Sequence, residues 1–249
     1  MKIFFLGTNG WFDTETGVTP CILIDSKEAY IVLDAGGGIY KLNQHITDTK
    51  KPIYLFISHL HIDHIWGLHI LQKFRFPQGM TTVVPESLGN SLKTFMNTPF
   101  TVSIDKLNTK TMMMELSEGN HTHPCLVSCF HLFHSSLDFG YRFNLEGKII
   151  SYSGDCGVNE KSMELAKNAD ILIHESSLEP GHISHSGWGH SNPEHAAQLA
   201  KDAGVGRLLL THFDARIYTT LEMRKDAEKV AQEIFPNTKT MVDDDFVEI

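Results

Sequence analysis

The segment that most constrains this chain is His-Leu-His-Ile-Asp-His at residues 59–64, which puts three imidazoles and one carboxylate into six residues. It follows the apolar run at residues 54–57, which is typical of a buried strand. Loops at the ends of strands in α/β sheets tend to carry ligands. Imidazole nitrogen and carboxylate oxygen are ordinary ligands for zinc and other divalent first-row metals. A solvated polar turn would explain any one of these histidines. Four candidate ligands together indicate a bound cation, because the imidazoles would repel one another once protonated.

The spacing resembles the H-x-H-x-D-H motif of the metallo-β-lactamase superfamily, and further candidate ligands follow in that family's order. His134 lies a few residues before Gly-Tyr-Arg at 140–142, which resembles the third motif of the family. His131 is the competing candidate, but its offset from Gly-Tyr-Arg fits less well. Asp155 follows the strand-like residues 149–152 and resembles the metal-bridging Asp. His212, in Thr-His-Phe after the strand-like residues 207–211, resembles the last ligand.

By this resemblance, seven residues form a dinuclear metal site that performs hydrolysis by attack of a metal-bridged hydroxide. One metal ion is expected on His59, His61 and His134, the second on Asp63, His64 and His212, and Asp155 bridges the two. Two divalent ions per chain are therefore expected. Zinc suits the mixed His/carboxylate set, with manganese or iron as alternatives.

Two more segments resemble the ribonuclease Z branch of the superfamily. They are His-Glu-Ser at 174–176 and Gly-His-Ser-x-Pro-Glu at 189–194, before a helix with an expected N-cap at Asn192. The resemblance implies three catalytic residues, Asp63, Glu175 and His190. His190 would stabilise the transition state or protonate the leaving group, while Glu175 holds its ring.

The loop at residues 180–189 carries His182, His185 and Trp188. These side chains either contact the substrate or are merely solvated, and the sequence favours neither alternative.

The resemblance implies an α/β fold (α+β in some schemes) of four layers, αββα, in which two mixed β-sheets are flanked by helices. Residues 1–249 would form a single metallo-β-lactamase-like hydrolase domain. The alternation of strand-like and helical segments is compatible with this fold, although residues 75–125 are hard to interpret. We further expect the methionines at 112–114 in the core, a helix-capping box of Thr219 and Glu222, and a solvated turn at residues 243–245.

The distance between two motifs bears on the substrate. Ribonuclease Z enzymes carry a long tRNA-gripping arm between the third His motif and the bridging Asp, whereas His134 and Asp155 are 21 positions apart here (155 − 134). The net charge of −9 also argues against a large basic surface for nucleic acid. We therefore expect a phosphodiesterase that acts on small anionic phosphodiesters, cyclic nucleotides or short RNA, without extended tRNA contact.

Three alternatives stay open. The first is an ester, thioester or lactone hydrolase of the same fold, and the second is a ribonuclease Z-type tRNA 3′ endonuclease. The third is a degenerate, non-catalytic binding protein, whose sign would be a missing ligand; no ligand position is missing.

The remaining sequence features concern the compartment. Four cysteines occur without a C-x-x-C pair, and no apolar run approaches the length of a membrane span. With no signal-peptide layout at the N-terminus, a reduced, cytoplasmic protein that uses no membrane is expected. A homodimer is compatible with the sequence, which leaves the substrate, the physiological metal and the oligomeric state open.

Overall fold

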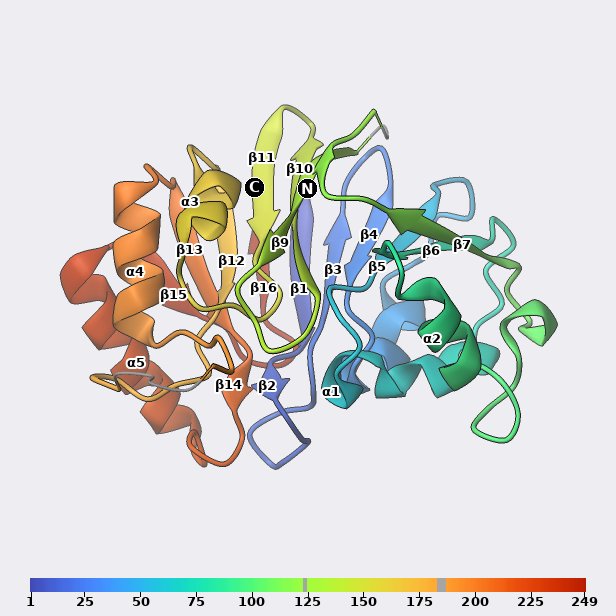
Figure 1. Cartoon of the computed structure of the whole chain (residues 1–249), viewed down its shortest axis with the longest axis horizontal. Helices are drawn as coiled ribbons and strands as arrows, with labels where there is room; N and C mark the ends of the chain where they lie inside the picture. The colour runs from blue at the N-terminus through green and yellow to red at the C-terminus, as the bar shows by residue number, and fades with distance from the viewer. Residues whose placement is uncertain (123–124, 183–186) are drawn as a thin grey trace.

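Two seven-stranded β-sheets lie face to face, and helices cover their outer faces (Figure 1). The computed structural model describes residues 1–122, 125–182 and 187–249. The four-layer αββα arrangement that the sequence predicted is confirmed.

The first sheet is built almost entirely from the N-terminal half of the chain. Its β16, β1, β3 and β4 pair antiparallel, and β4, β5, β6 and β7 pair parallel. The strands in spatial order are β16 (Phe246–Glu248), β1 (Lys2–Gly7), β3 (Cys21–Asp25), β4 (Tyr30–Leu33), β5 (Ile53–Phe56), β6 (Met80–Pro85) and β7 (Thr111–Leu116).

The second sheet repeats this pattern with the C-terminal half. From one edge, β8 to β11 pair antiparallel, and β11, β12, β13 and β15 pair parallel. The strands in that order are β8 (Gly119–Asn120), β9 (Leu126–Leu132), β10 (Asp138–Leu145), β11 (Lys148–Tyr152), β12 (Ile171–Glu175), β13 (Arg207–Thr211) and β15 (Thr238–Thr240).

A small parallel pair joins the two halves. β2 (Asn9–Gly10) pairs with β14 (Phe213–Asp214), directly after the predicted ligand His212. A Cβ on Gly10 would lie 2.6 Å from the His212 ring, so glycine is needed for this close approach.

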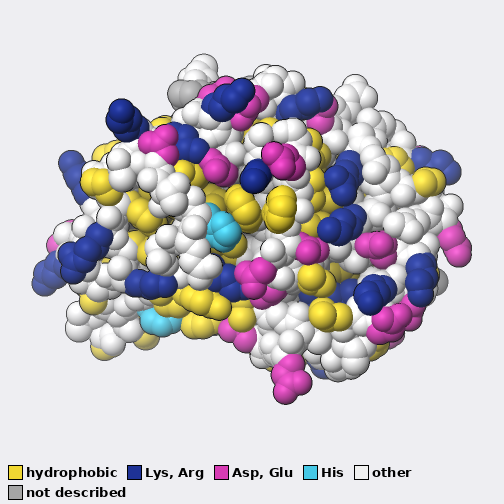
Figure 2. Space-filling view, turned by 180° about the vertical axis from the view of Figure 1, so that it is seen from behind, with side chains coloured by type: hydrophobic (Ala, Val, Ile, Leu, Met, Phe, Trp, Pro, Cys, Tyr) yellow, Lys and Arg dark blue, Asp and Glu magenta, His cyan; other side chains and the backbone are white. Residues whose placement is uncertain are grey.

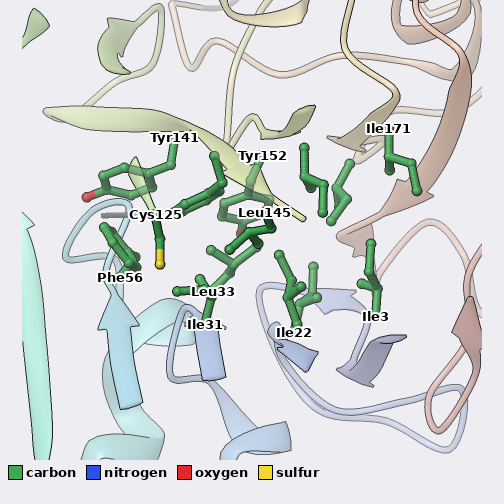
Figure 3. Close-up of a cluster of buried hydrophobic side chains, with 14 of the residues drawn as sticks. Ile3, Ile22, Ile31, Leu33, Phe56, Cys125, Tyr141, Leu145, Tyr152 and Ile171 are labelled. Carbon is green, nitrogen blue, oxygen red and sulfur yellow. The ribbon is translucent and has the colours of Figure 1, made fainter. Parts of the chain in front are cut away.

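The largest apolar cluster fills the space between the sheets. Figure 3 shows Ile22 and Ile31 of the first sheet facing Tyr141, Leu145 and Tyr152 of the second. These side chains are at most 2% exposed. Fully burying one such side chain contributes about 1.5–3 kcal/mol, so this layer is what holds the sheets together and fixes the relative position of their ends.

Two further apolar clusters attach the helices to the outer faces. The first sheet is covered by the 3₁₀ helices η1 (Gly37–Gln44) and η2 (Trp66–Lys73) and by α1 (Ile62–Ile65) and α2 (Gly89–Phe95). A short 3₁₀ turn, η3 (Ile104–Lys106), lies in the connection to β7. The second sheet is covered by α3 (Glu160–Ala166), α4 (Pro193–Asp202) and α5 (Leu221–Ile234).

Local sequence explains where these helices begin. The Asn159 side chain accepts a hydrogen bond from Ser162 N and so caps α3, and the Asn192 side chain caps α4 by accepting from His195 N. Pro193 occupies the first turn of α4, where its missing N–H costs nothing. The Asn192 cap was expected, and it sets the direction of the chain just after His190.

Three local expectations were wrong. Met112 and Met114 are 58% and 38% exposed, because β7 is an edge strand and its alternate residues face outward. The cap of α5 is Thr220, whose side chain accepts from Met223 N, and the expected box of Thr219 and Glu222 does not form.

The third error concerns Asp243 in the segment 243–245, which was expected as a solvated turn; the neighbouring Asp244 side chain is indeed 70% exposed. The Asp243 carboxylate accepts hydrogen bonds from Thr8 Oγ1 at 2.7 Å and Val18 N at 2.9 Å, and Lys41 Nζ lies 3.5 Å away. Asp243 therefore ties the C-terminal segment to the loop after β1.

Candidate metal centre

The histidine-rich segment forms the loop between β5 and α1. The carboxyl end of β5 delivers His59 into the interior, and His61 is the N-cap residue of α1. One turn of α1 then directs His64 back inward, so that His59 and His64 are both fully buried. His61 and Asp63 remain partly exposed.

A first group of ligand atoms gathers around His59. Single ligand atoms of His59, His61, His134 and Asp155 all lie within 4.8 Å of one another. His134 Nε2 is 3.2 Å from His61 Nδ1, although the two residues are far apart in sequence.

A second group, Asp63, His64 and His212, satisfies the same criterion. His64 Nε2 lies 3.0 Å from His212 Nε2, and His212 Nε2 lies 3.3 Å from Asp63 Oδ2. Helix α1, which follows β5, supplies Asp63 and His64, and the residue after β13 is His212, so segments that follow strands of both sheets contribute to the group.

Asp155 lies between the groups, in the loop after β11. Its Oδ2 is 3.9 Å from His59 Nε2, whereas its Oδ1 is 3.4 Å from His64 Nε2 and 3.3 Å from His212 Nε2. Each carboxylate oxygen therefore faces a different group, as a bridging ligand requires.

Outer hydrogen bonds fix four of the histidine rings. Asp34 accepts from His64 Nδ1 at 2.8 Å. The Ser58 hydroxyl is hydrogen-bonded to His59 Nδ1 at 3.0 Å, and Asp138 Oδ2 lies 2.7 Å from the same nitrogen. The Gly189 carbonyl is 3.1 Å from His134 Nδ1, and the Ser177 hydroxyl is 2.9 Å from His212 Nδ1. In all four rings this leaves Nε2 directed at the cluster, the arrangement that metal-binding histidines adopt.

The histidine pair of the second group tests whether a cation fits. The Asp34 carboxylate accepts from His64 Nδ1, so in the neutral imidazole that binds a metal the lone pair is on Nε2. Ser177 donates to the His212 carbonyl at 3.0 Å, so its hydroxyl accepts from His212 Nδ1. When both rings are neutral, as metal binding requires, the two Nε2 lone pairs face each other at 3.0 Å. Among the described residues, His59 Nε2 and Asp155 Oδ1 are also buried without a hydrogen-bond partner. A cation satisfies all of these atoms, so the residues present fit a metal.

The electrostatics agree with this fit. Burial, and then the neighbouring His64, lowers the pKa of His59 to about 3, so this imidazole is neutral and able to bind a metal at neutral pH. Burial also lowers the pKa of His64, but Asp155 and Asp63 outweigh it and raise that pKa well above its usual value. The carboxylates therefore favour a positive charge between the groups, whether a proton or a metal ion carries it.

Glu175 and His190 form a pair beside the two groups. The Glu175 carboxylate is fully buried at the end of β12, and Oε1 accepts from His190 Nδ1 at 2.8 Å. Cys156 N donates to Oε1 at 3.1 Å and Ser177 N to Oε2 at 2.9 Å. Burial lowers the pKa of His190, but the Glu175 carboxylate outweighs it and raises the pKa to about 9. Since Glu175 occupies Nδ1, Nε2 is the nitrogen left for a ligand.

A cavity of about 570 Å³ opens onto these residues. Its lining includes His61, Asp63, Asp155, His190 and His212, and its rim carries Trp11, Trp188 and Arg216. Not all of the fifteen histidines belong to the site. His131 and His195 are exposed and lie outside the two ligand groups.

The loop at 180–189 is only partly described. Trp188 lines the cavity, whereas the His182 imidazole lies 3.6 Å from Glu179 on the surface. His185 lies outside the described residues. Sequence reasoning missed Asp138, Trp11 and Arg216. Asp138 lies within the motif that contains His134, and Arg216 follows His212 by four positions (216 − 212), so nearness to a ligand was the available signal.

Comparisons with known proteins place these findings in a family. Residues 29–213, more than half of the chain, match the family model described as the β-lactamase superfamily domain. The ribonuclease Z of Enterococcus faecalis is 29% identical over 308 aligned positions, which cover 100% of this chain and 97% of that protein. The ribonuclease Z of Bacillus velezensis is 26% identical, covering 100% and 98%.

Two solved structures share the fold. The metallo-β-lactamase fold protein YhfI of Bacillus subtilis superposes with a TM-score of 0.81 at 20% identity, covering 99% of both chains. The short form of human tRNase Z gives a TM-score of 0.78 at 24% identity, covering 100% of this chain and 99% of that one.

Proposed function

The chain belongs to the β-lactamase superfamily, and from that premise we propose that it is a metal-dependent phosphodiesterase of the ribonuclease Z type that acts on small phosphodiesters. Its use of divalent metal follows from the family and from the clustered His and Asp side chains. The pairing of buried Glu175 with His190 beside these ligand groups carries the proposal, because it adds a proton donor that metal binding itself does not need.

We propose two ions per chain, with zinc as the first choice. His59, His61 and His134 would hold one ion, Asp63, His64 and His212 the other, and Asp155 both. The mixture of imidazole and carboxylate suits zinc, and manganese or iron can take the same ligands. When bound, such ions supply charge neutralisation on phosphoryl oxygen and activation of water.

The remaining steps belong to protein side chains. His190 Nε2 would donate a hydrogen bond to a phosphoryl oxygen or a proton to the leaving alkoxide, and Glu175 fixes the ring for this purpose. Asp63, whose Oδ2 accepts from Trp11 N at 2.8 Å, is held at the mouth of the cavity, where it would orient the attacking water.

The proposed substrate is small because the protein lacks room for an arm. β10 and β11 are joined by a tight turn at Glu146 and Gly147, and this hairpin accounts for the chain between His134 and Asp155. The alignment with the E. faecalis enzyme spans 308 positions against 249 residues here, so at least 59 positions (308 − 249) have no counterpart. On the face in Figure 2, acidic and basic side chains interleave instead of forming a basic patch.

We also propose that residues 1–249 act as one hydrolase domain in the cytoplasm. The buried thiols of Cys21, Cys129 and Cys156 suit a reducing compartment. In the described parts of the chain, no helix has both the length and the apolarity for crossing a bilayer.

Activity on a panel of esters tests the proposal. The purified protein should hydrolyse bis(p-nitrophenyl) phosphate, and chelation should abolish the activity. Faster hydrolysis of thioesters or lactones, with no phosphodiester turnover, would instead identify an ester hydrolase of the same fold.

A further inference from the structure

Two exposed indoles on the cavity rim have no role in the site described so far. The side chains of Trp11 and Trp188 are 57% and 59% exposed, and both line the cavity. Exposed tryptophan forgoes the free energy of burial and is enriched where proteins bind ligands. Neither side chain belongs to a ligand group.

The two indoles flank different ligand groups. Trp11 N donates to Asp63 Oδ2 at 2.8 Å, which places Trp11 beside the group of Asp63, His64 and His212. The Trp188 ring lies 6.4 Å from the His61 ring, and Trp188 O accepts from Ser135 N at 3.0 Å. Trp188 therefore stands beside the group that contains His61 and His134.

Trp11 is held in an unusual backbone conformation and supported by a cation. Its φ of 75° lies in the left-handed region that bulky residues rarely adopt, so the loop holds the indole at this place against a local preference. The Arg216 guanidinium lies 4.9 Å from the centre of the Trp11 ring. The same guanidinium donates to Asp214 Oδ2 at 3.3 Å. Arg216 also lines the cavity, where its charge can meet phosphate.

We propose that the site takes a dinucleotide step, with one nucleobase on Trp11 and the next on Trp188, and the phosphodiester between them at the ligand groups. A phosphodiester has two ester arms that leave phosphorus in different directions, and the two indoles stand beside different halves of the centre. Aromatic side chains stack on any base, whatever its sequence. The cavity volume of about 570 Å³ lies within the range of about 300–1,000 Å³ for small-ligand sites. This inference rests on the proposed phosphodiesterase function.

Binding of three diester analogues tests it. In each analogue methylene groups replace both bridging ester oxygens, so no ester bond is left to hydrolyse, and the analogues carry no base, one thymine or two thymines. Their Kd values are measured by calorimetry on the metal-loaded protein. Each added base should tighten binding by ~5- to ~150-fold, the worth of one stacked base.

The variants separate the two surfaces. Trp11→Ala and Trp188→Ala should each abolish one of the two gains in affinity that the added bases give, and the double variant should abolish both. Phenylalanine in place of either tryptophan should keep most of that gain. Phe100→Ala is the control, because this aromatic side chain is 66% exposed but lies outside the cavity lining. The Phe100→Ala variant should show the same gain in affinity for each added base as the wild-type protein. Equal Kd values for all three analogues in the wild-type protein, or Trp variants that keep both gains in affinity, would overturn the inference.

Two further measurements are independent of each other. One asks whether the ligand is a free dinucleotide or part of a longer strand, and the other tests the proposed phosphodiesterase function. A four-nucleotide analogue that binds no more tightly than the two-base analogue would identify a free dinucleotide, and tighter binding would identify a single-stranded oligonucleotide. Both results require the two-base site. Hydrolysis of methyl p-nitrophenyl phosphate tests the phosphodiesterase function on its own, because that diester carries no base and the binding series needs no turnover.

Discussion

Replacement of His190 by alanine should separate metal binding from catalysis. His190 is not required for either of the two ligand groups, and Glu175 accepts a hydrogen bond from its Nδ1. We expect His190→Ala to keep its metal and to lose most of its turnover on phosphodiesters with poor leaving groups.

The structure sets the size of two separate effects. Loss of a general acid typically lowers kcat by ~10²–10⁴-fold, which is about 3–5 kcal/mol of transition-state stabilisation. The variant also leaves the Glu175 carboxylate buried without its cationic partner. Breaking a buried charge pair costs about 3–5 kcal/mol of folding free energy. The cost should fall at or below the lower end here, since the His190 side chain is 22% exposed and two backbone N–H groups still bind Glu175.

The assay combines kcat on two diesters with metal analysis and thermal unfolding. An alkyl diester needs protonation of its leaving group and should lose more rate than a p-nitrophenyl diester. The double variant Glu175→Gln/His190→Ala removes the uncompensated charge and should regain stability but not turnover. Unchanged kcat on both diesters would refute the reasoning and leave His190 a merely structural role, and loss of a metal ion would make it a ligand.

Three further variants and substrates test the remaining assignments. Asp155→Ala should lose metal and all hydrolysis while its circular dichroism stays native, because the residue lies in a loop after β11 and outside the apolar core; a folded variant with near wild-type turnover would contradict the bridging role. His131→Ala should keep its full metal content, whereas His134→Ala should lose metal. The reverse outcome in elemental analysis would show that His131, and not His134, is the metal ligand. Pre-tRNA should be processed poorly or not at all, and efficient, position-specific removal of a 3′ trailer by the pure protein would show that the missing arm does not limit the substrate.

The clustering of the ligand-type residues was easier to predict from sequence than the packing around them. The ligand-type residues lie at strand ends, where an apolar run followed by His or Asp is visible in the chain, and the structure brings all seven into two touching groups. His59 and His212 are 153 positions apart (212 − 59), so their meeting depends on the packing of the two sheets. Only the resemblance to a family supplied that packing beforehand.

The errors have a common physical origin. Met112 and Met114 look like core residues, but whether a strand lies at a sheet edge is decided by distant pairing and not by its own composition. The acidic residues at 243–245 look solvated, but the partners of Asp243 are Thr8, Val18 and Lys41, more than 200 positions away. Trp11 gives no local signal at all, because its role depends on Asp63 and Arg216.

Metal titration against activity tests the central claim most directly. The protein is stripped with chelator, and zinc is returned in steps while bound metal and hydrolysis of bis(p-nitrophenyl) phosphate are followed together. We predict no activity without metal, and turnover that rises to a plateau at two ions per chain. Undiminished phosphodiester hydrolysis by the metal-free protein, or full metal loading without any phosphodiester hydrolysis, would contradict the account.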